Sequence, residues 1–272
     1  GFILSASIVG SGELIATTQL GAKAGFVAMW VILVSCLVKV AVQLEFGKRA
    51  IMTGETTFAS FNSLPGPKLG KANWTVWTWL VLMLIKFLQV GAIVGLVSVL
   101  LNMAFPGLSD FWWLIIVVIA ISSIVVSGYY KILEVLSVSM IGLFTIFTFF
   151  SLIALQSTES AISIANITSG LQFQIPDGAG MAIVVIGAFG LTGVGGDEIM
   201  AYNYWLIEKG YASNTGQNDG TEEWNRRAKG WIKVMYIDAI FAMIVYTLVT
   251  DAFFLLGSAL IYGKGAFSVG GK

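Results

Sequence analysis

The chain has 272 residues, of which 57% are hydrophobic and only 11% are charged. This apolar share, with a mean hydropathy of +0.87, exceeds what a soluble domain of this length can bury and indicates an integral membrane protein whose partner is the lipid bilayer. Basic and acidic residues balance at 15 each, which argues against a nucleic-acid partner. Histidine is absent and Cys36 is the single cysteine, so a Cys/His metal cluster and an internal disulfide are both excluded.

Continuous apolar stretches follow one another along the chain, each near the roughly 20 residues that a helix needs to cross a bilayer. They predict seven transmembrane helices, at about residues 2–20, 26–46, 76–105, 111–126, 132–155, 181–207 and 231–262. The stretches are continuous rather than alternating, so helices and not strands are expected to satisfy the backbone in lipid. The predicted fold class is therefore all-α.

Cations are distributed unevenly between the predicted loops. The loops after the first, third and fifth spans hold only Lys23. Those after the second, fourth and sixth hold Lys48, Arg49, Lys68, Lys71, Lys131, Lys209, Arg226, Arg227, Lys229 and Lys233. The positive-inside rule then places the N-terminus in the cytoplasm, and we expect a bacterial inner (plasma) membrane. The chain starts without methionine and ends after an apolar run, so we also expect a fragment of a longer protein.

Two of the predicted spans are interrupted by glycines next to carboxylates. The first contains Gly10, Gly12 and Glu13, and the sixth contains the glycine-rich segment 190–198 with Asp197 and Glu198. Glycine weakens a helix by about 1 kcal/mol relative to alanine, and a carboxylate at bilayer depth costs more. Paired interruptions indicate discontinuous helices, whose freed carbonyls and helix ends bind ions or substrate near the midplane in secondary transporters.

These residues carry a resemblance to a known family. The segments 1–22, with Gly12-Glu13-Leu-Ile-Ala, and 196–203, with Asp197-Glu198-Ile-Met200, resemble the first and sixth helices of the Nramp divalent-metal transporters. Segments 128–134 and 248–252 are similar to their fifth and seventh helices. The resemblance implies a leucine-transporter-type inverted-repeat bundle, of which this chain holds about seven of about eleven helices. It would form one transporter domain over 1–272, with a first repeat at about 1–156 and part of a second at about 179–272.

The likeness also implies a site, with departures from the family pattern. The first-helix Asp-Pro-Gly-Asn is here Gly10-Ser11-Gly12-Glu13, so one acid has moved by three positions, while the metal-binding methionine is retained as Met200. The expected metal site comprises Glu13, Asp197, Met200 and Gly10. Expected substrate-binding or hinge residues are Gly12, Gly195, Gly196, Glu198 and Tyr202. The third-helix acids of the family align with Gln89 and Ala92, and the candidates for coupling to a proton or sodium ion are Gln89, Lys86 and Asp238.

Several functions stay open at this point. The favoured one is alternating-access transport of a divalent cation, Mn- or Fe-like with Mg also left open, with the metal as substrate and no prosthetic group. The first alternative is a sodium-coupled symporter of an amino acid or small organic solute on the same fold. The second is a non-transporting membrane sensor or assembly subunit. An enzyme is not expected, because no nucleophile elbow, phosphate loop or His/Cys metal motif is present. No oligomer is required.

Overall fold

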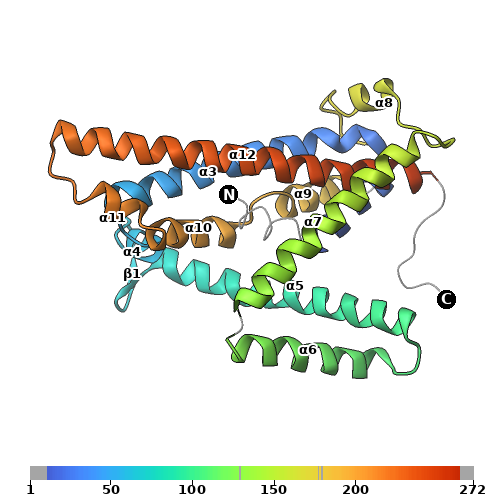
Figure 1. The fold of residues 1–272 in the computed structure, drawn as a ribbon, viewed down its shortest axis with the longest axis horizontal. Coiled ribbons are helices and arrows are strands. Elements are labelled where there is room, and N and C mark those ends of the chain that lie inside the picture. Colours follow the sequence, from blue (N-terminus) through green and yellow to red (C-terminus); the bar gives the residue numbers. More distant parts are fainter. Residues whose placement is uncertain (1–10, 129, 177, 179, 264–272) are drawn as a thin grey trace. The chain divides into compact units, whose positions relative to one another are not determined.

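The structure is a computed structural model that describes residues 11–128, 130–176, 178 and 180–263. Within these residues it is helical apart from one two-stranded hairpin and the connecting loops (Figure 1). The transmembrane-length or apolar helices are α2 (Ser11–Ala24), α3 (Met29–Thr53), α5 (Trp74–Ala104), α6 (Asp110–Val126), α7 (Tyr130–Leu155), α9 (Met181–Leu191), α10 (Gly196–Glu208) and α12 (Glu222–Leu260). Shorter elements are η1 (Gly25–Ala28), α4 (Thr57–Asn62), β1 (Lys68–Leu69), β2 (Ala72–Asn73), α8 (Ile164–Ser169) and α11 (Tyr211–Thr215).

The predicted all-α membrane fold is confirmed. Four helical stretches are long and apolar enough to cross a membrane: Glu13–Thr53, Trp74–Ala104, Met181–Glu208 and Glu222–Leu260. Two shorter apolar helices, Asp110–Val126 and Gly142–Leu155, coincide with the predicted fourth and fifth spans. The first two predicted spans are separated only by the 3-10 turn η1, so that they form one helical stretch.

The chain divides into two compact units. The first contains residues 1–57 and 140–272, and the second contains residues 58–139. The helices that carry Glu13, the sixth-span interruption and the predicted seventh span therefore all belong to the first unit. The division of the sequence into inverted repeats stays a prediction.

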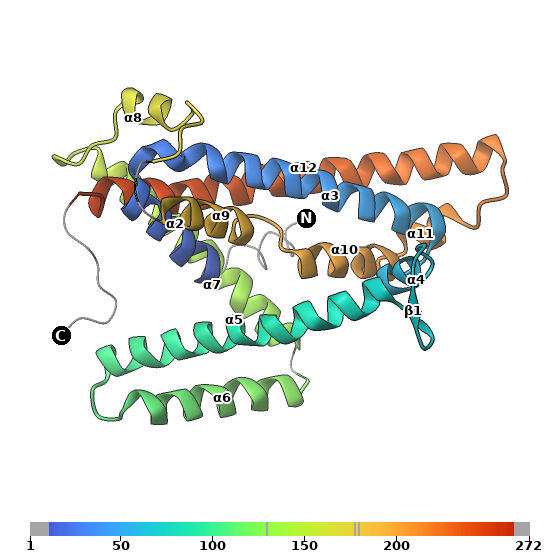
Figure 2. The same cartoon turned by 180° about the vertical axis from the view of Figure 1, so that it is seen from behind.

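Close packing through small residues organises the first unit. Helix α12 packs along α2 and α3, and Figures 1 and 2 both show α3 and α12 side by side. At the α2–α12 contact, a Cβ atom added to Gly257 would come within 2.9 Å of Thr18 Cα, and one added to Gly21 would collide with the backbone of Phe254. The two backbones approach this closely because neither glycine has a side chain.

Helix α3 meets α10 in the same way. A Cβ atom on Gly47 would lie 3.0 Å from Leu206 Cδ1 and 3.1 Å from Tyr202 Cε1, both on α10. Helix α3 ends at Gly54, which has a left-handed φ of 68°. The contacts at Gly47 hold α10 beside α3, and α10 is the second half of the predicted sixth span.

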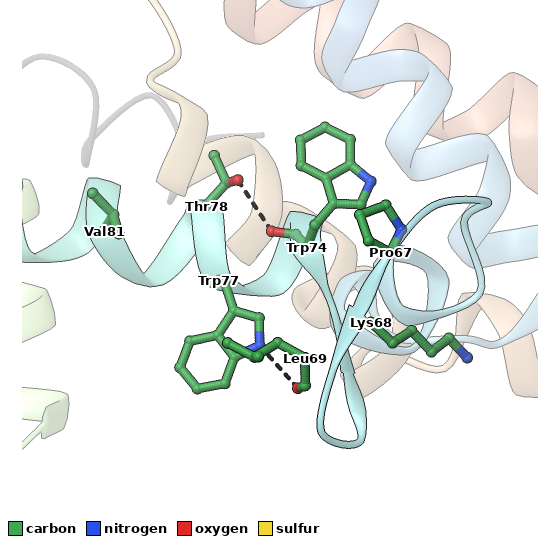
Figure 3. Close-up of a pocket in the computed structure, with 7 residues that line it drawn as sticks. All are labelled: Pro67, Lys68, Leu69, Trp74, Trp77, Thr78 and Val81. Atoms are coloured by element: carbon green, nitrogen blue, oxygen red, sulfur yellow. Dashed lines mark hydrogen bonds between the residues drawn. The ribbon is translucent and has the colours of Figure 1, made fainter.

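After α4, the second unit contains a short hairpin that leads into α5. Strands β1 and β2 pair antiparallel, with Lys68 opposite Asn73. The Asn73 side chain accepts a hydrogen bond from Thr75 N at 3.2 Å and so caps the N-terminus of α5. The indole of Trp77 donates to the Leu69 carbonyl oxygen at 3.2 Å (Figure 3). Helix α5 therefore starts from a hydrogen-bonded turn.

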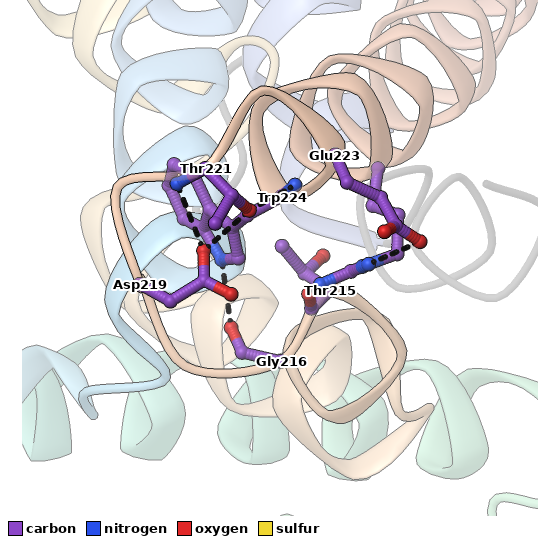
Figure 4. Close-up of polar contacts among 7 residues, drawn as sticks. Thr215, Gly216, Asp219, Thr221, Glu223 and Trp224 are labelled. Carbon is purple, nitrogen blue, oxygen red and sulfur yellow. Dashed lines mark hydrogen bonds and ion pairs between the residues drawn. The ribbon is translucent and has the colours of Figure 1, made fainter.

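The linker between α10 and α12 is folded. The Thr221 hydroxyl accepts a hydrogen bond from Trp224 N at 3.1 Å and caps α12, and the Trp224 indole donates to the Gly216 carbonyl at 2.9 Å (Figure 4). Arg227 pairs with Glu223 one turn away at 3.1 Å. Trp224 is only 2% exposed, so this connection packs against the unit.

Candidate functional site

The sixth predicted span is interrupted where the glycines indicated. Helix α9 ends at Leu191 and α10 begins at Gly196, and the residues between them are not helical (Figure 2). Thr192 is extended, with φ −79° and ψ 140°, and Gly193 has a left-handed φ of 76°. A non-glycine residue at Gly193 would be strained. We call the four residues 192–195 the break.

Glu13 reaches into the break from α2. Its Oε1 atom accepts a hydrogen bond from the Gly193 backbone N–H, and its Oε2 atom accepts one from the Thr250 hydroxyl of α12 at 2.8 Å. The residue is only 4% exposed. A carboxylate is tolerated there because both of its oxygens receive hydrogen bonds.

Helix α3 supports the other side of the break with two side chains one turn apart. The Ser35 hydroxyl lies 2.7 Å from the Phe189 carbonyl oxygen and 2.9 Å from that of Thr192. The Lys39 ammonium donates to the carbonyl oxygens of Gly190 at 2.8 Å and Thr192 at 2.6 Å. The last carbonyls of α9 have no partner within their own helix, and a cation there is favoured by the helix dipole.

The two acids after the break lie in the first turn of α10. A Cβ atom on Gly195 would lie 3.1 Å from Asp197 Oδ1 and would collide with the Glu198 carboxylate, so both acids fold back toward the break. Negative charge is favoured at this helix N-terminus. The charge of Glu198 acts electrostatically on both Glu13 and Lys39. In the part of the chain that the structure describes, no three Asp, Glu, Cys or His side chains gather as a metal cluster.

The other predicted site residues lie at several places in the chain. Met200 is buried on α10, where its carbonyl oxygen accepts a hydrogen bond from the Thr57 hydroxyl at 3.4 Å, and Tyr202 is buried half a turn further on. Gly195 and Gly196 cap and begin α10, and Asp238 lies on α12 in the same unit. Gln89 and Lys86 lie on α5 in the second unit. Gly10 lies outside the described residues, and Gly12 is in the first turn of α2.

Sequence reasoning missed three residues that hold the break. Ser35 and Thr250 are small polar residues in apolar stretches and gave no signal. Lys39 is a basic residue within an apolar stretch, and its ammonium donates to two backbone carbonyls. The sequence carried a usable signal for it, because Ser35 and Lys39 are four residues apart and share one face of α3.

A discontinuous apolar helix, held at its break by buried polar and charged side chains from three other helices of the same unit, is the construction of a membrane transporter. The chain belongs to the Nramp family, since the family model described as natural resistance-associated macrophage protein-like matches residues 1–270. It is thus a member of a family of divalent-metal transporters, which are carriers rather than enzymes. No curated protein sequence matches the chain significantly.

Proposed function

We propose that this protein carries a divalent metal ion, Mn or Fe in preference to Mg or Ca, by alternating access at the break between α9 and α10. The single observation that carries the proposal is the position of Glu13. Its carboxylate is buried and bonded to Gly193, in the middle of the interrupted helix. A buried carboxylate at the interruption of a transmembrane helix is the kind of group that binds a cation in carriers with discontinuous helices.

The proposed ligands combine hard and soft donors. Glu13 and Asp197 offer carboxylate oxygens, which suit Mg, Mn and Ca, and Met200 offers a thioether sulfur, which favours transition ions. When both are ionised, the carboxylates of Glu13 and Glu198 repel one another. A divalent cation between them would remove that repulsion. Thr250 and the Gly193 N–H would then release the Glu13 oxygens as the cation takes their place.

Mn²⁺ uptake into proteoliposomes tests this proposal. We expect Glu13→Gln to lower uptake about tenfold or more, because it keeps the size of the side chain and removes its charge. Glu45→Gln is the matched control, since Glu45 is exposed on α3 and pairs with Lys48 at the surface. Met200→Ala is expected to shift preference from Mn²⁺ toward Mg²⁺ and Ca²⁺. Unchanged Mn²⁺ uptake in the Glu13→Gln variant would refute the assignment.

One observation favours the alternative, a sodium-coupled symporter of an amino acid. The Lys39 ammonium at the break is a cation that could pair with the carboxylate of such a substrate. Sodium-driven uptake of labelled amino acids, measured beside Mn²⁺ uptake, separates the two functions. Vesicles that accumulate neither cargo above the protein-free background would instead indicate a sensor or assembly subunit.

A further inference from the structure

The Lys39 ammonium occupies backbone carbonyls at the end of α9. Its two acceptors, Gly190 O and Thr192 O, are the groups that an interrupted helix leaves without partners. A transported cation entering the break would be attracted to the same end of α9, where the helix dipole is negative. Lys39 is thus placed as a cation that belongs to the protein itself.

Several other groups at the break also have hydrogen-bond partners within the protein. Both Glu13 oxygens accept hydrogen bonds, the Phe189 carbonyl receives the Ser35 hydroxyl, and Thr192 N and Oγ1 both donate to the Ala188 carbonyl at 2.9 Å. These hydrogen bonds offset the cost of burying the groups that make them.

We propose that Lys39 takes the place of the cargo cation at the carbonyl oxygens of Gly190 and Thr192. Its ammonium would hold the interrupted helix in the same conformation when no cargo is bound, so that the empty carrier can return across the membrane. This inference rests on the proposed transport function. Lys39 is then a positioning residue that acts through the backbone of α9.

The proposal separates two modes of transport. Net uptake requires the empty carrier to return, whereas exchange of cargo on one side for cargo on the other does not. If Lys39 stabilises the empty form, Lys39→Met should slow net Mn²⁺ uptake about tenfold or more and slow Mn²⁺ exchange much less, because exchange does not pass through the empty form. Lys39→Arg should restore net uptake in part, because a guanidinium can also donate to two carbonyl oxygens. Lys23→Met, which removes an exposed cation on α2, is the control and should change neither mode.

Equal slowing of both modes in Lys39→Met would overturn the proposal, because it would make Lys39 a residue of cargo binding or of general folding. Absence of Mn²⁺ transport by the wild-type protein would instead refute the proposed function. A second measurement tests Lys39 independently of the cargo. Hydrogen exchange of the backbone at residues 188–196 should be several-fold faster in cargo-free Lys39→Met than in wild type or Lys39→Arg. Unchanged exchange in that variant would refute the inference, whatever the carrier transports.

A different observation, in the second unit, carries a second inference. A groove of about 460 Å³ lies at the start of α5, lined by Pro67, Lys68, Leu69, Trp74, Trp77, Thr78 and Val81 (Figure 3). The Trp77 indole is held by the Leu69 carbonyl, and the Trp74 indole lies against Gly66, where a Cβ atom would come within 2.5 Å of its Nε1. The two rings are therefore fixed in place.

We infer that this groove binds the headgroup of an anionic phospholipid. Helix α5 is a membrane-spanning candidate, so its first turn lies where the bilayer meets water. Tryptophan rings are favoured at that depth, and the exposed Lys68 ammonium attracts a phosphate group. The acyl chain would follow Trp77 and Val81 along the helix. The positive charge of Lys68 therefore favours an anionic lipid over a zwitterionic one.

Quenching of tryptophan fluorescence by brominated lipids tests this inference on the full chain in nanodiscs. The contribution of Trp77 is the difference between wild type and Trp77→Phe. Brominated phosphatidylglycerol should quench it more than brominated phosphatidylcholine at the same mole fraction, and Lys68→Glu should remove the excess. Lys48→Glu, on α3 in the first unit, is the control and should retain it. Equal quenching by the two lipids, or an excess that survives Lys68→Glu, would contradict the assignment.

Discussion

Glu13 on α2 and Thr250 on α12 are joined by a buried hydrogen bond of 2.8 Å between residues 237 positions apart. The bond links the start of the described chain to its last helix at the level of the break. Because Glu13 is also bonded to Gly193, one carboxylate connects three helical segments. The geometry of the site therefore depends on contacts that the sequence order does not reveal.

Removing the Thr250 hydroxyl should destabilise the protein. Thr250→Val keeps the shape of the side chain but leaves Glu13 Oε2 buried without this donor, and we expect a loss of about 1–3 kcal/mol in the free energy of unfolding. Thr250→Ser keeps the donor and should lose less. Unfolding in mixed micelles by denaturing detergent provides the measurement. Equal stability of the valine and serine variants would show that the hydrogen bond contributes nothing.

The break should tolerate alanine at one glycine and not at another. Gly193 has a φ of 76°, and a Cβ atom there would lie 3.3 Å from Cys36 Sγ, so Gly193→Ala should lower stability by about 1–2 kcal/mol. Gly196 begins α10, and a Cβ atom there meets no other atom within 4 Å. Gly196→Ala should be neutral or stabilise by up to about 1 kcal/mol. Thermal unfolding of the two variants in detergent tests this difference in stability. A Gly193→Ala variant more stable than the Gly196→Ala variant would contradict the prediction.

The α2–α12 contact should depend on the absence of a side chain at Gly257. Alanine there would collide with the Thr18 backbone, and moving backbone apart costs about 1–3 kcal/mol. Gly230, also on α12, has open space around it, so Gly230→Ala should instead stabilise the helix by about 0.5–1 kcal/mol. The unfolding midpoint of each variant is the readout. A tolerated Gly257→Ala would argue against close packing of these two helices.

Acid should loosen the linker before α12. The Thr221 hydroxyl and backbone N–H donate to the Asp219 carboxylate and lower its pKa. A lowered pKa means that the ionised group stabilises the folded linker above the ordinary value of about 3.9, and that this contribution is lost as the pH falls through the lower, folded value. The protection of residues 216–224 against hydrogen exchange, relative to the intrinsic rate at each pH, should therefore fall as the pH is lowered below about 4.

Asp219→Asn provides the control for this pH dependence. Its amide can still accept a hydrogen bond from Thr221 but does not titrate in this range. The acid-dependent loss of protection at residues 216–224 should therefore be smaller in the variant. An identical loss in both proteins would assign the effect to another group.

The sequence by itself determined the membrane class, the approximate limits of the helices and the position of the break. These are local properties: the length of an apolar stretch decides whether a helix can cross lipid, and clustered glycines lower helix stability where they occur. The glycines of 190–196 therefore marked the end of α9 and the start of α10 within a few residues. Glu13 stood out for the same reason, as a carboxylate in an apolar stretch.

Only the tertiary structure decided which side chains hold the break. Ser35, Lys39 and Thr250 lie far from Gly193 in sequence, and their roles depend on how α3 and α12 pack beside α9 and α10. That packing follows from close approaches at Gly21, Gly47 and Gly257, which no local pattern specifies. A lysine in an apolar helix can pair with an acid, extend to the membrane surface or bond to a carbonyl, and only the position of its neighbours selects among them.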